Sequence, residues 1–359
     1  MIELKTLNKK ALSEFISSGK YRSDAFLPIT KHRAESQIRN PKADDDQTLL
    51  ILAYEDEKLA GYVGCLPDFF LIDGKKFRYA WLSTLFVSSD FRGKRIAQKL
   101  LDKAFEEYSG NIAITEFTPE AESLYNKIKF FKYIQAKEGK RFYLKTDFQN
   151  IIPAKKTQLK TLKPFFKLSD FFFNSLISFK NSFQEKPDFK FEILSEIDDE
   201  SKDFIIQFPS NRTADEINWF VKNPWILEGG KPDSEYLFSS YSKQFKYFWI
   251  KIFNAHNEFE ASALLLLRDG HLKIPYLFAN NNLQNFIDFL AYFSEKNRVK
   301  QITSYQTDLN SEIENNGNFP KIHSRNMERR YMFHEKMLSH LPLNFKPNFQ
   351  DGDGDCALT

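Results

Sequence analysis

The most informative part of the chain reads LFVSSDFRGKRIAQKLL, from Leu85 to Leu101. It begins as an apolar strand and ends as a helix, and a short loop with basic residues joins the two. The first turn of a helix leaves backbone N–H groups without partners, and the helix dipole adds positive potential there. The loop therefore predicts a pyrophosphate site. A solvated basic helix start without a ligand explains the loop alone equally well.

The neighbouring segments predict an alternation of strands and helices. Asp73-Gly74 predicts a tight hairpin turn. Thr118-Pro119 has the residue types that cap and begin a helix. Around these signals we expect strands over 49–54, 59–65, 69–72, 76–87 and 111–117, helices over 96–108 and from 118 onward, and a closing hairpin of 130–134 with 141–144 around Glu138-Gly139.

The second half repeats this outline with almost no residue identity. Asp269-Gly270 again predicts a hairpin turn between two apolar strands, and a helix with one apolar face follows. The repeated order predicts a diverged duplication. We expect a first domain over residues 1–150, a helical linker over 151–190 and a second domain over 191–359.

The linker carries apolar residues at helical spacing. We expect this stripe to be buried against both domains, and a helix on a membrane surface is the alternative. The stripe consists of Phe165, Leu168, Phe172, Leu176, Phe179 and Phe183.

Two motifs in the first half resemble those of the GNAT superfamily of acyl-CoA-dependent N-acetyltransferases. The loop resembles the pattern R-x-x-G-x-G/A at Arg92 and Ala97, with Arg95 at a glycine position. The second motif resembles N-x-x-A-x-x-L-Y-x-x-x-G-F over residues 118–130, with Thr118 in place of Asn and Lys129 in place of Gly. The resemblance covers residues 1–147 well and residues 190–340 only by the order of elements.

The resemblance implies an α+β fold with a mixed sheet, in two tandem GNAT-like copies, of which the second is degenerate. It implies acetyl-CoA as cosubstrate, with backbone groups of Leu85, Phe86 and Val87 pairing with the pantetheine arm. Tyr125 would protonate the leaving thiolate as general acid, and packing on the core is its alternative role. The remaining cofactor-binding residues that the resemblance implies are Arg92, Gly93, Lys94, Arg95, Ile96, Ala97 and Thr118.

The general base is not readable from the sequence. Glu116 is our candidate and Asp68 is another, and ordered water can do the same work. Arg33 and Arg39 would bind an anionic acceptor or lie solvated on a loop. The six histidines show no metal-site spacing, so we expect no metal.

Two segments of the second half have their own expected roles. Phe278 to Leu283 stand where the basic loop stands in the first half. This segment has three Asn and no Arg, Lys or Gly, so we expect it to bind no acyl-CoA. Arg212 to Trp225 would line an acceptor wall, or form an amphipathic helix with a buried Trp219 and Phe220. The acidic tail DGDGD, residues 351–355, lacks the pattern of a calcium loop, so we expect a tail that folds back or stays mobile.

The composition excludes several classes of function. Lys plus Arg number 51 against 48 acids, which argues against a nucleic-acid partner. Cys65 and Cys356 form no CxxC pair, and no apolar run is long enough to span a membrane, so we expect a cytoplasmic protein. The sequence favours an acetyltransferase that acts on an amine of a small molecule, with an amino sugar as one candidate acceptor. A non-catalytic acyl-CoA sensor or protein-interaction module is the alternative.

Overall fold

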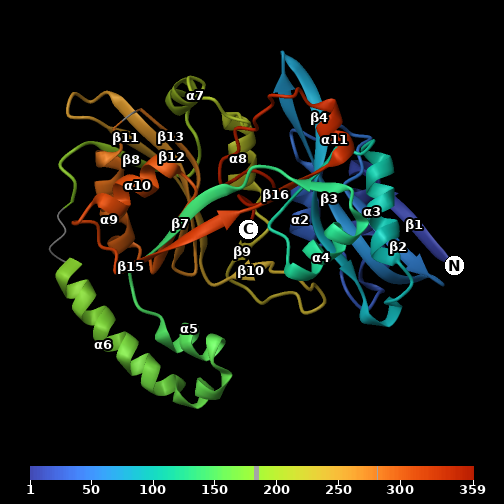
Figure 1. Ribbon diagram of the computed structural model, residues 1–359, viewed down its shortest axis with the longest axis horizontal. Helices are drawn as coiled ribbons and strands as arrows, with labels where there is room; N and C mark the ends of the chain where they lie inside the picture. Colours follow the sequence, from blue (N-terminus) through green and yellow to red (C-terminus); the bar gives the residue numbers. More distant parts are fainter. Residues whose placement is uncertain (182–185, 281) are drawn as a thin grey trace. The chain divides into compact units, whose positions relative to one another are not determined.

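The computed structural model describes residues 1–181, 186–280 and 282–359, so Phe183 and Asn281 lie outside the described residues. Contacts divide the chain into two compact units, each assembled from separate stretches (Figure 1). The first unit takes Met1–Lys137, Pro209–Lys243 and Arg329–Thr359, and the second takes Glu138–Phe208 and Gln244–Glu328. These units cut across the contiguous ranges expected from the sequence.

The first unit is built on a mixed sheet of seven strands in the order β1-β2-β3-β4-β5-β16-β6. All its neighbouring strands are antiparallel except β4 and β5, which are parallel. The strands are β1 (Ile2–Leu7), β2 (Leu50–Glu55), β3 (Lys58–Ile72), β4 (Lys75–Val87), β5 (Ile112–Thr115), β6 (Phe131–Tyr133) and β16 (Tyr331–His334).

Helices cover both faces of this sheet. On one face, α3 (Ile96–Glu107) and α4 (Pro119–Ile128) pack their apolar sides on the core. On the other, α1 (Lys9–Ser17) and α2 (Lys31–Ile38) supply residues to a second apolar cluster. The unit also holds α8 (Ala214–Lys222), α11 (Glu335–His340) and the short strands β9 (Leu227–Glu228) and β10 (Tyr241–Ser242). Trp219 and Phe220 of α8 are buried, as the amphipathic-helix alternative predicts.

The second unit has a sheet of the same size and pattern, in the order β8-β11-β12-β13-β14-β7-β15. Its parallel pair is β13 with β14, at the place that β4 and β5 hold in the first sheet. Its strands are β7 (Lys137–Tyr143), β8 (Phe191–Leu194), β11 (Phe245–Phe253), β12 (Phe259–Arg268), β13 (His271–Ala279), β14 (Gln301–Ser304) and β15 (His323–Arg329), and its helices are α5 (Phe148–Lys155), α6 (Lys163–Asn181), α7 (Asp199–Ile205), α9 (Gln284–Lys296) and α10 (Thr307–Asn315).

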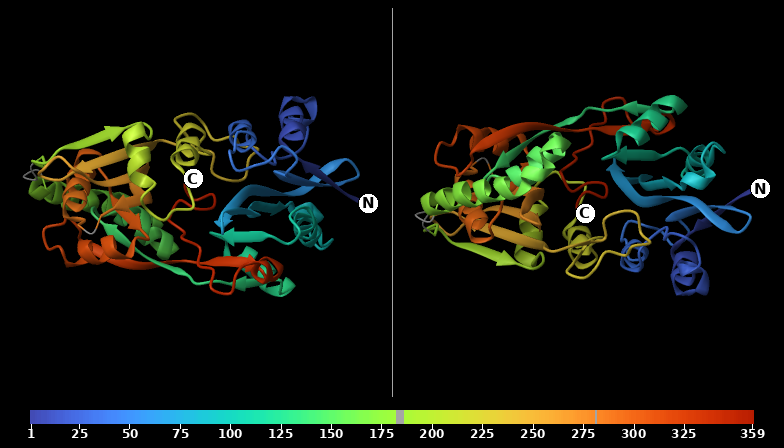
Figure 2. Two further views of the ribbon diagram at one scale, coloured as in Figure 1. Left: turned by 90° about the horizontal axis from the view of Figure 1, so that it is seen from above. Right: turned by 90° about the horizontal axis from the view of Figure 1, so that it is seen from below.

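Each sheet contains one strand from the other half of the sequence. β16 lies between β5 and β6 in the first sheet, and β7 lies between β14 and β15 in the second (Figures 1 and 2, where the green β7 runs beside the orange-red β15). The predicted hairpin around Glu138-Gly139 is therefore wrong. β6 and β7 are adjacent in sequence, but β6 pairs with β16 and β7 pairs with β14.

The local turn predictions are confirmed. Asp73 and Gly74 both have positive φ, as do Asp269 and Gly270, and each pair joins two antiparallel strands. Two central residues with φ above zero match the twist of the flanking strands, which is why Asp-Gly is a strong hairpin signal. The Phe stripe of α6 departs from expectation, because its described members are exposed instead of buried.

Lys129 ends α4 in a left-handed conformation, with φ of 61°. A helix commonly ends on a left-handed residue, and glycine is preferred there because a Cβ is strained at that angle. The resembled motif has Gly at this position, so the chain keeps the backbone shape of the glycine without the residue.

We predict that Lys129→Gly stabilises the protein by about 1 kcal/mol, because it removes the left-handed strain. Urea unfolding measures the change. Lys127→Gly is the matched control: Lys127 lies in the last turn of the same helix, is also exposed, and its replacement should destabilise by up to about 1 kcal/mol. Equal effects of the two replacements would contradict the prediction.

Candidate active site

β4 and β5 part shortly after they pair. Their recorded register joins Ala80 to Ile112 and Trp81 to Ala113, while β4 continues to Val87 along β3. Thr84 has φ of 52°, and the register between β3 and β4 shifts at the same point. Such a bulge bends a strand and interrupts its ladder. The segment of Leu85, Phe86 and Val87 thus runs beyond the described pairing with β5, and its edge can accept an extended ligand as an added strand.

The loop after β4 leads into an uncapped helix. A short 3₁₀ turn (Ser89–Phe91) precedes Gly93, which has φ of 83°, and α3 begins at Ile96 with no side-chain cap. Arg92, Gly93 and Arg95 are exposed at this start. Backbone N–H groups and guanidinium groups therefore face solvent together, which is the arrangement that binds anions.

Two of the predicted phosphate-binding residues, Lys94 and Arg95, are restricted by their surroundings: one by an ion pair and the other by its backbone conformation. Lys94 Nζ lies 2.5 Å from Glu55 Oε2, so this ammonium already has a carboxylate partner. Arg95 has φ of 58°, in the left-handed region, where the resembled pattern has glycine. As at Lys129, the chain adopts the glycine-like backbone with a side chain present, at a cost of about 1–2 kcal/mol.

Tyr125 projects from α4 into the core. Thr118 caps this helix by accepting a hydrogen bond from Ala121 N at 3.3 Å. The Tyr125 ring lies 5.3 Å from the Phe131 ring and 6.2 Å from the Phe117 ring, centroid to centroid. Burial raises the pKa of Tyr125, so the phenol keeps its proton at neutral pH. This is the protonation state that a general acid needs, although the packing is also that of a core residue.

Glu116 follows β5 with φ of 51° and is held by an arginine. Its Oε1 accepts a hydrogen bond from Arg329 Nη2 at 2.6 Å, and Arg329 also contacts Asp351. A guanidinium stabilises the ionised form of a carboxylate, which makes that carboxylate a weaker proton acceptor.

The acidic tail folds back onto this part of the unit. Asp351 pairs with Arg329, Asp353 Oδ1 lies 3.0 Å from Arg212 Nε, and Asp355 Oδ2 accepts a hydrogen bond from Ser83 Oγ at 2.8 Å. These carboxylates meet protein donors, so the folded-back alternative for the tail is confirmed.

Gly354 places the tail where β4 and β5 part. It has φ of 77°, and a Cβ there would lie 3.0 Å from Thr115 Cγ2 and 3.5 Å from Trp81 Cδ2. Only a glycine combines this backbone angle with so close an approach. The next residue, Asp355, is thereby brought against Ser83 of β4.

Sequence reasoning missed the environment of Asp355. Withdrawal from water raises its pKa, and the Ser83 hydroxyl and Arg33 oppose this effect. Arg33 Nη2 donates to the same Ser83 Oγ at 2.7 Å, so an arginine, a serine and a carboxylate form a chain of hydrogen bonds. The repeated Asp-Gly pattern marked the tail as unusual, but its partners are far away in sequence.

The side chains of Arg33 and Asp68 are both buried and make polar contacts. Arg33 is buried, and its guanidinium lies 3.7 Å from the centroid of the Trp225 ring, so it is neither solvated nor on a loop. The Asp68 carboxylate lies 2.9 Å from Lys42 Nζ and 2.6 Å from Arg212 Nη2. Burial alone would raise the pKa of Asp68, but these two cations outweigh it and lower the pKa. Asp68 is therefore a structural ion-pair partner and a poor base.

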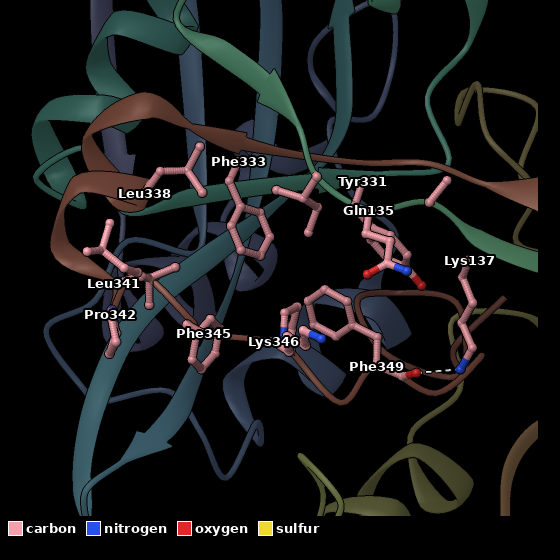
Figure 3. A pocket seen from close by; sticks show the side chains of 14 residues that line it. Gln135, Lys137, Tyr331, Phe333, Leu338, Leu341, Pro342, Phe345, Lys346 and Phe349 are labelled. Carbon is pink, nitrogen blue, oxygen red and sulfur yellow. Dashed lines mark hydrogen bonds between the residues drawn. The ribbon is translucent and has the colours of Figure 1, made fainter.

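An apolar cavity of about 410 Å³ lies in the same unit, beside the tail (Figure 3). Phe333, Phe345 and Phe349 surround it, and Lys137 donates a hydrogen bond to the carbonyl oxygen of Phe349. Its size is that of a pocket for an organic group.

In the second unit, carboxylates of Glu192, Asp198 and Glu200 lie close enough to hold a cation. The ammonium of the buried Lys251 already occupies this position, with contacts to all three carboxylates. The group is thus an ion-pair cluster in which partly exposed carboxylates surround a buried lysine.

Comparison with known proteins agrees with this architecture. Residues 17–131 match the acetyltransferase (GNAT) family. A search of curated proteins found no match. Among solved structures, a tandem GNAT protein from the clavulanic acid biosynthesis pathway is 8% identical, with 92% of this chain and 98% of that chain covered and a TM-score of 0.50.

A GCN5-related N-acetyltransferase from Anabaena variabilis is 11% identical, with 92% of this chain and 72% of that chain covered, at the same TM-score of 0.50. The chain therefore has a tandem GNAT-like fold. The matched residues 17–131 lie in the first unit, and both seven-stranded sheets have their parallel pair at the same place in the strand order.

Proposed function

We propose that this chain transfers an acetyl group from acetyl-CoA to an amine of a small molecule, with an amino sugar as the first acceptor to test. The observation that carries the proposal is the parting of β4 from β5 directly before the uncapped start of α3. The end of β4 has an edge beyond its pairing with β5, and the start of α3 has donors for an anion. A pantetheine arm would pair with the first, and the pyrophosphate that follows it would bind at the second.

The proposed cosubstrate contacts follow from this order. Leu85, Phe86 and Val87 would pair with the pantetheine amides, and the backbone N–H groups from Gly93 to Ala97, among them those of Lys94, Arg95 and Ile96, would hold the pyrophosphate. The exposed guanidinium groups of Arg92 and Arg95 would neutralise its charge. Thr118 acts through its cap on α4, which fixes the helix that carries Tyr125.

The chemistry is direct attack of the amine on the thioester. The nitrogen forms a bond to the acyl carbon while the carbon–sulfur bond breaks. A base takes the proton that the amine loses, and Tyr125 gives a proton to the departing thiolate. No covalent intermediate with the enzyme is needed.

Two carboxylates are candidates for the base. Glu116 is the sequence-based candidate, and its ion pair with Arg329 weakens it as a proton acceptor. Asp355 lies at the parting of the strands, where its raised pKa makes the ionised carboxylate a better acceptor. We favour Asp355.

The second unit has a different proposed role. The segment from Phe278 to Leu283, directly before α9, contains no basic residue or glycine that could bind a pyrophosphate. We propose that this unit binds no acyl-CoA and serves as a scaffold.

The alternative function is a non-catalytic acyl-CoA sensor or interaction module. Two features favour this alternative: the ion pair of Lys94 with Glu55, and the left-handed backbone of Arg95. Both make the proposed pyrophosphate loop less like the resembled pattern. Binding of acetyl-CoA without thioester cleavage across a panel of amines would support this alternative.

Calorimetric titration with acetyl-CoA tests the proposed site. We predict saturable binding, and Arg92→Ala should weaken it by about tenfold or more through loss of a charge-assisted phosphate contact. Arg325→Ala is the control, because Arg325 is an exposed arginine on β15 of the second unit. Absence of binding by the folded protein would sink the proposal.

Tyr125→Phe tests the general acid. We predict a fall in kcat of about a hundredfold with unchanged affinity for acetyl-CoA, because only proton transfer to sulfur is lost. Tyr108→Phe is the control: its hydroxyl, also buried in the first unit, donates to the Thr48 carbonyl oxygen. If turnover survives Tyr125→Phe, the proton comes from another group.

The pH profile of kcat/KM distinguishes the two carboxylates. A base must be ionised to accept a proton, so activity should fall as the pH drops through its pKa, which is raised for Asp355. We predict that Asp355→Asn removes most of the activity, whereas Glu116→Gln leaves an acidic limb. The reverse pattern would assign the base to Glu116.

A further inference from the structure

The Phe stripe of α6 is exposed along its described length. Phe165, Phe172 and Phe179 are 63%, 60% and 68% exposed, and Leu168 and Leu176 are 67% and 53% exposed. The neighbouring Phe171 is 72% exposed. Isolated exposed apolar residues are normal, but a continuous patch of large ones marks an interaction surface.

The orientation of α6 is fixed by polar contacts on its other side. Asp170 accepts hydrogen bonds from Phe148 N at 2.8 Å and Gln149 N at 2.9 Å, at the start of α5. Asn174 Nδ2 donates to the carbonyl oxygen of Thr146 at 2.9 Å, and its Oδ1 accepts from Thr146 N at 2.8 Å. Figure 1 shows α5 and α6 side by side. The helix therefore directs polar groups inward and aromatic groups outward, the reverse of an ordinary surface helix.

The exposed charged residues named around the stripe are lysines. From Phe148 to Asn181 the sequence contains several lysines and a single acid, Asp170, which is buried in the contacts just described. Four lysines of this segment are exposed, namely Lys156, Lys160, Lys163 and Lys167. An exposed apolar face bordered by lysines complements a surface that is both apolar and anionic.

We propose that α6, with the exposed lysines in its first turns and just before it, binds the surface of a membrane containing anionic lipids. The Phe stripe would enter the boundary between headgroups and acyl chains, and the lysines would pair with lipid phosphates and carboxylates. Among the described residues, no helix has the length and apolarity to cross a bilayer, which agrees with a helix that lies in the interface. A second copy of the chain fits less well, because pairing two such surfaces brings like charges together.

Vesicle cosedimentation of the full chain tests this proposal, which is independent of acetyl transfer. We expect binding to phosphatidylcholine vesicles that contain phosphatidylserine, little binding to pure phosphatidylcholine, and weaker binding at high salt. Phe172→Ser with Leu176→Ser should weaken binding by about tenfold or more. Leu71→Ser is the control, since Leu71 is equally exposed, at 67%, in the first unit.

A charge variant separates the lysines from the aromatic residues. Lys160→Glu with Lys163→Glu should abolish the dependence on phosphatidylserine, whereas Lys75→Glu on β4 should not. Circular dichroism of each variant verifies folding. Failure of the folded wild-type chain to bind anionic vesicles, or equal binding to both lipid mixtures, overturns the proposal. A dimer in sedimentation velocity that Phe172→Ser dissociates, without vesicle binding, would instead assign the stripe to an interface between copies.

Discussion

The parting of β4 from β5 is the constraint on which the rest of the first unit depends. Backbone N–H and carbonyl groups of a strand need partners, and β4 extends past the end of its recorded pairing with β5 to Val87. The bulge at Thr84 turns this segment away, and the loop to α3 follows at once. A strand edge and the uncapped start of a helix are thereby placed in succession, and both offer donors to one extended anionic ligand.

Each sheet includes one strand from the other half of the sequence, β16 in the first sheet and β7 in the second. This explains why segments that are distant in sequence lie together at the proposed site. β16 pairs with β5 and β6. Arg329 begins the C-terminal stretch Arg329–Thr359 of the first unit, and the acidic tail lies near the end of that stretch. Arg329 then reaches Glu116, and the tail delivers Asp355 to Ser83. Because the C-terminal segment belongs to the first unit, the proposed cofactor loop and the proposed base come from opposite ends of the sequence.

Local features were predictable from the sequence because they depend on nearby residues. The turn at Asp73-Gly74, the helix expected over 96–108 and the Thr118 cap all follow from short-range geometry. Partners across the sheet do not: β7 looked like the second strand of a hairpin, yet it pairs with β14. The same limit hid Asp355, whose environment is created by Ser83 and Arg33, and it misassigned Asp68, whose ion pairs come from Lys42 and Arg212. The outward direction of the Phe stripe was hidden as well, because spacing defines a helical face without telling which side is covered.

Hydrogen exchange with and without acetyl-CoA tests the central claim most directly. A ligand that pairs with β4 and caps α3 slows exchange of the amides that it engages. The account predicts protection in peptides covering residues 85–97, and none in the corresponding second-unit segment, residues 272–290. Unchanged exchange over residues 85–97 at saturating acetyl-CoA, or protection confined to the second unit, would contradict it.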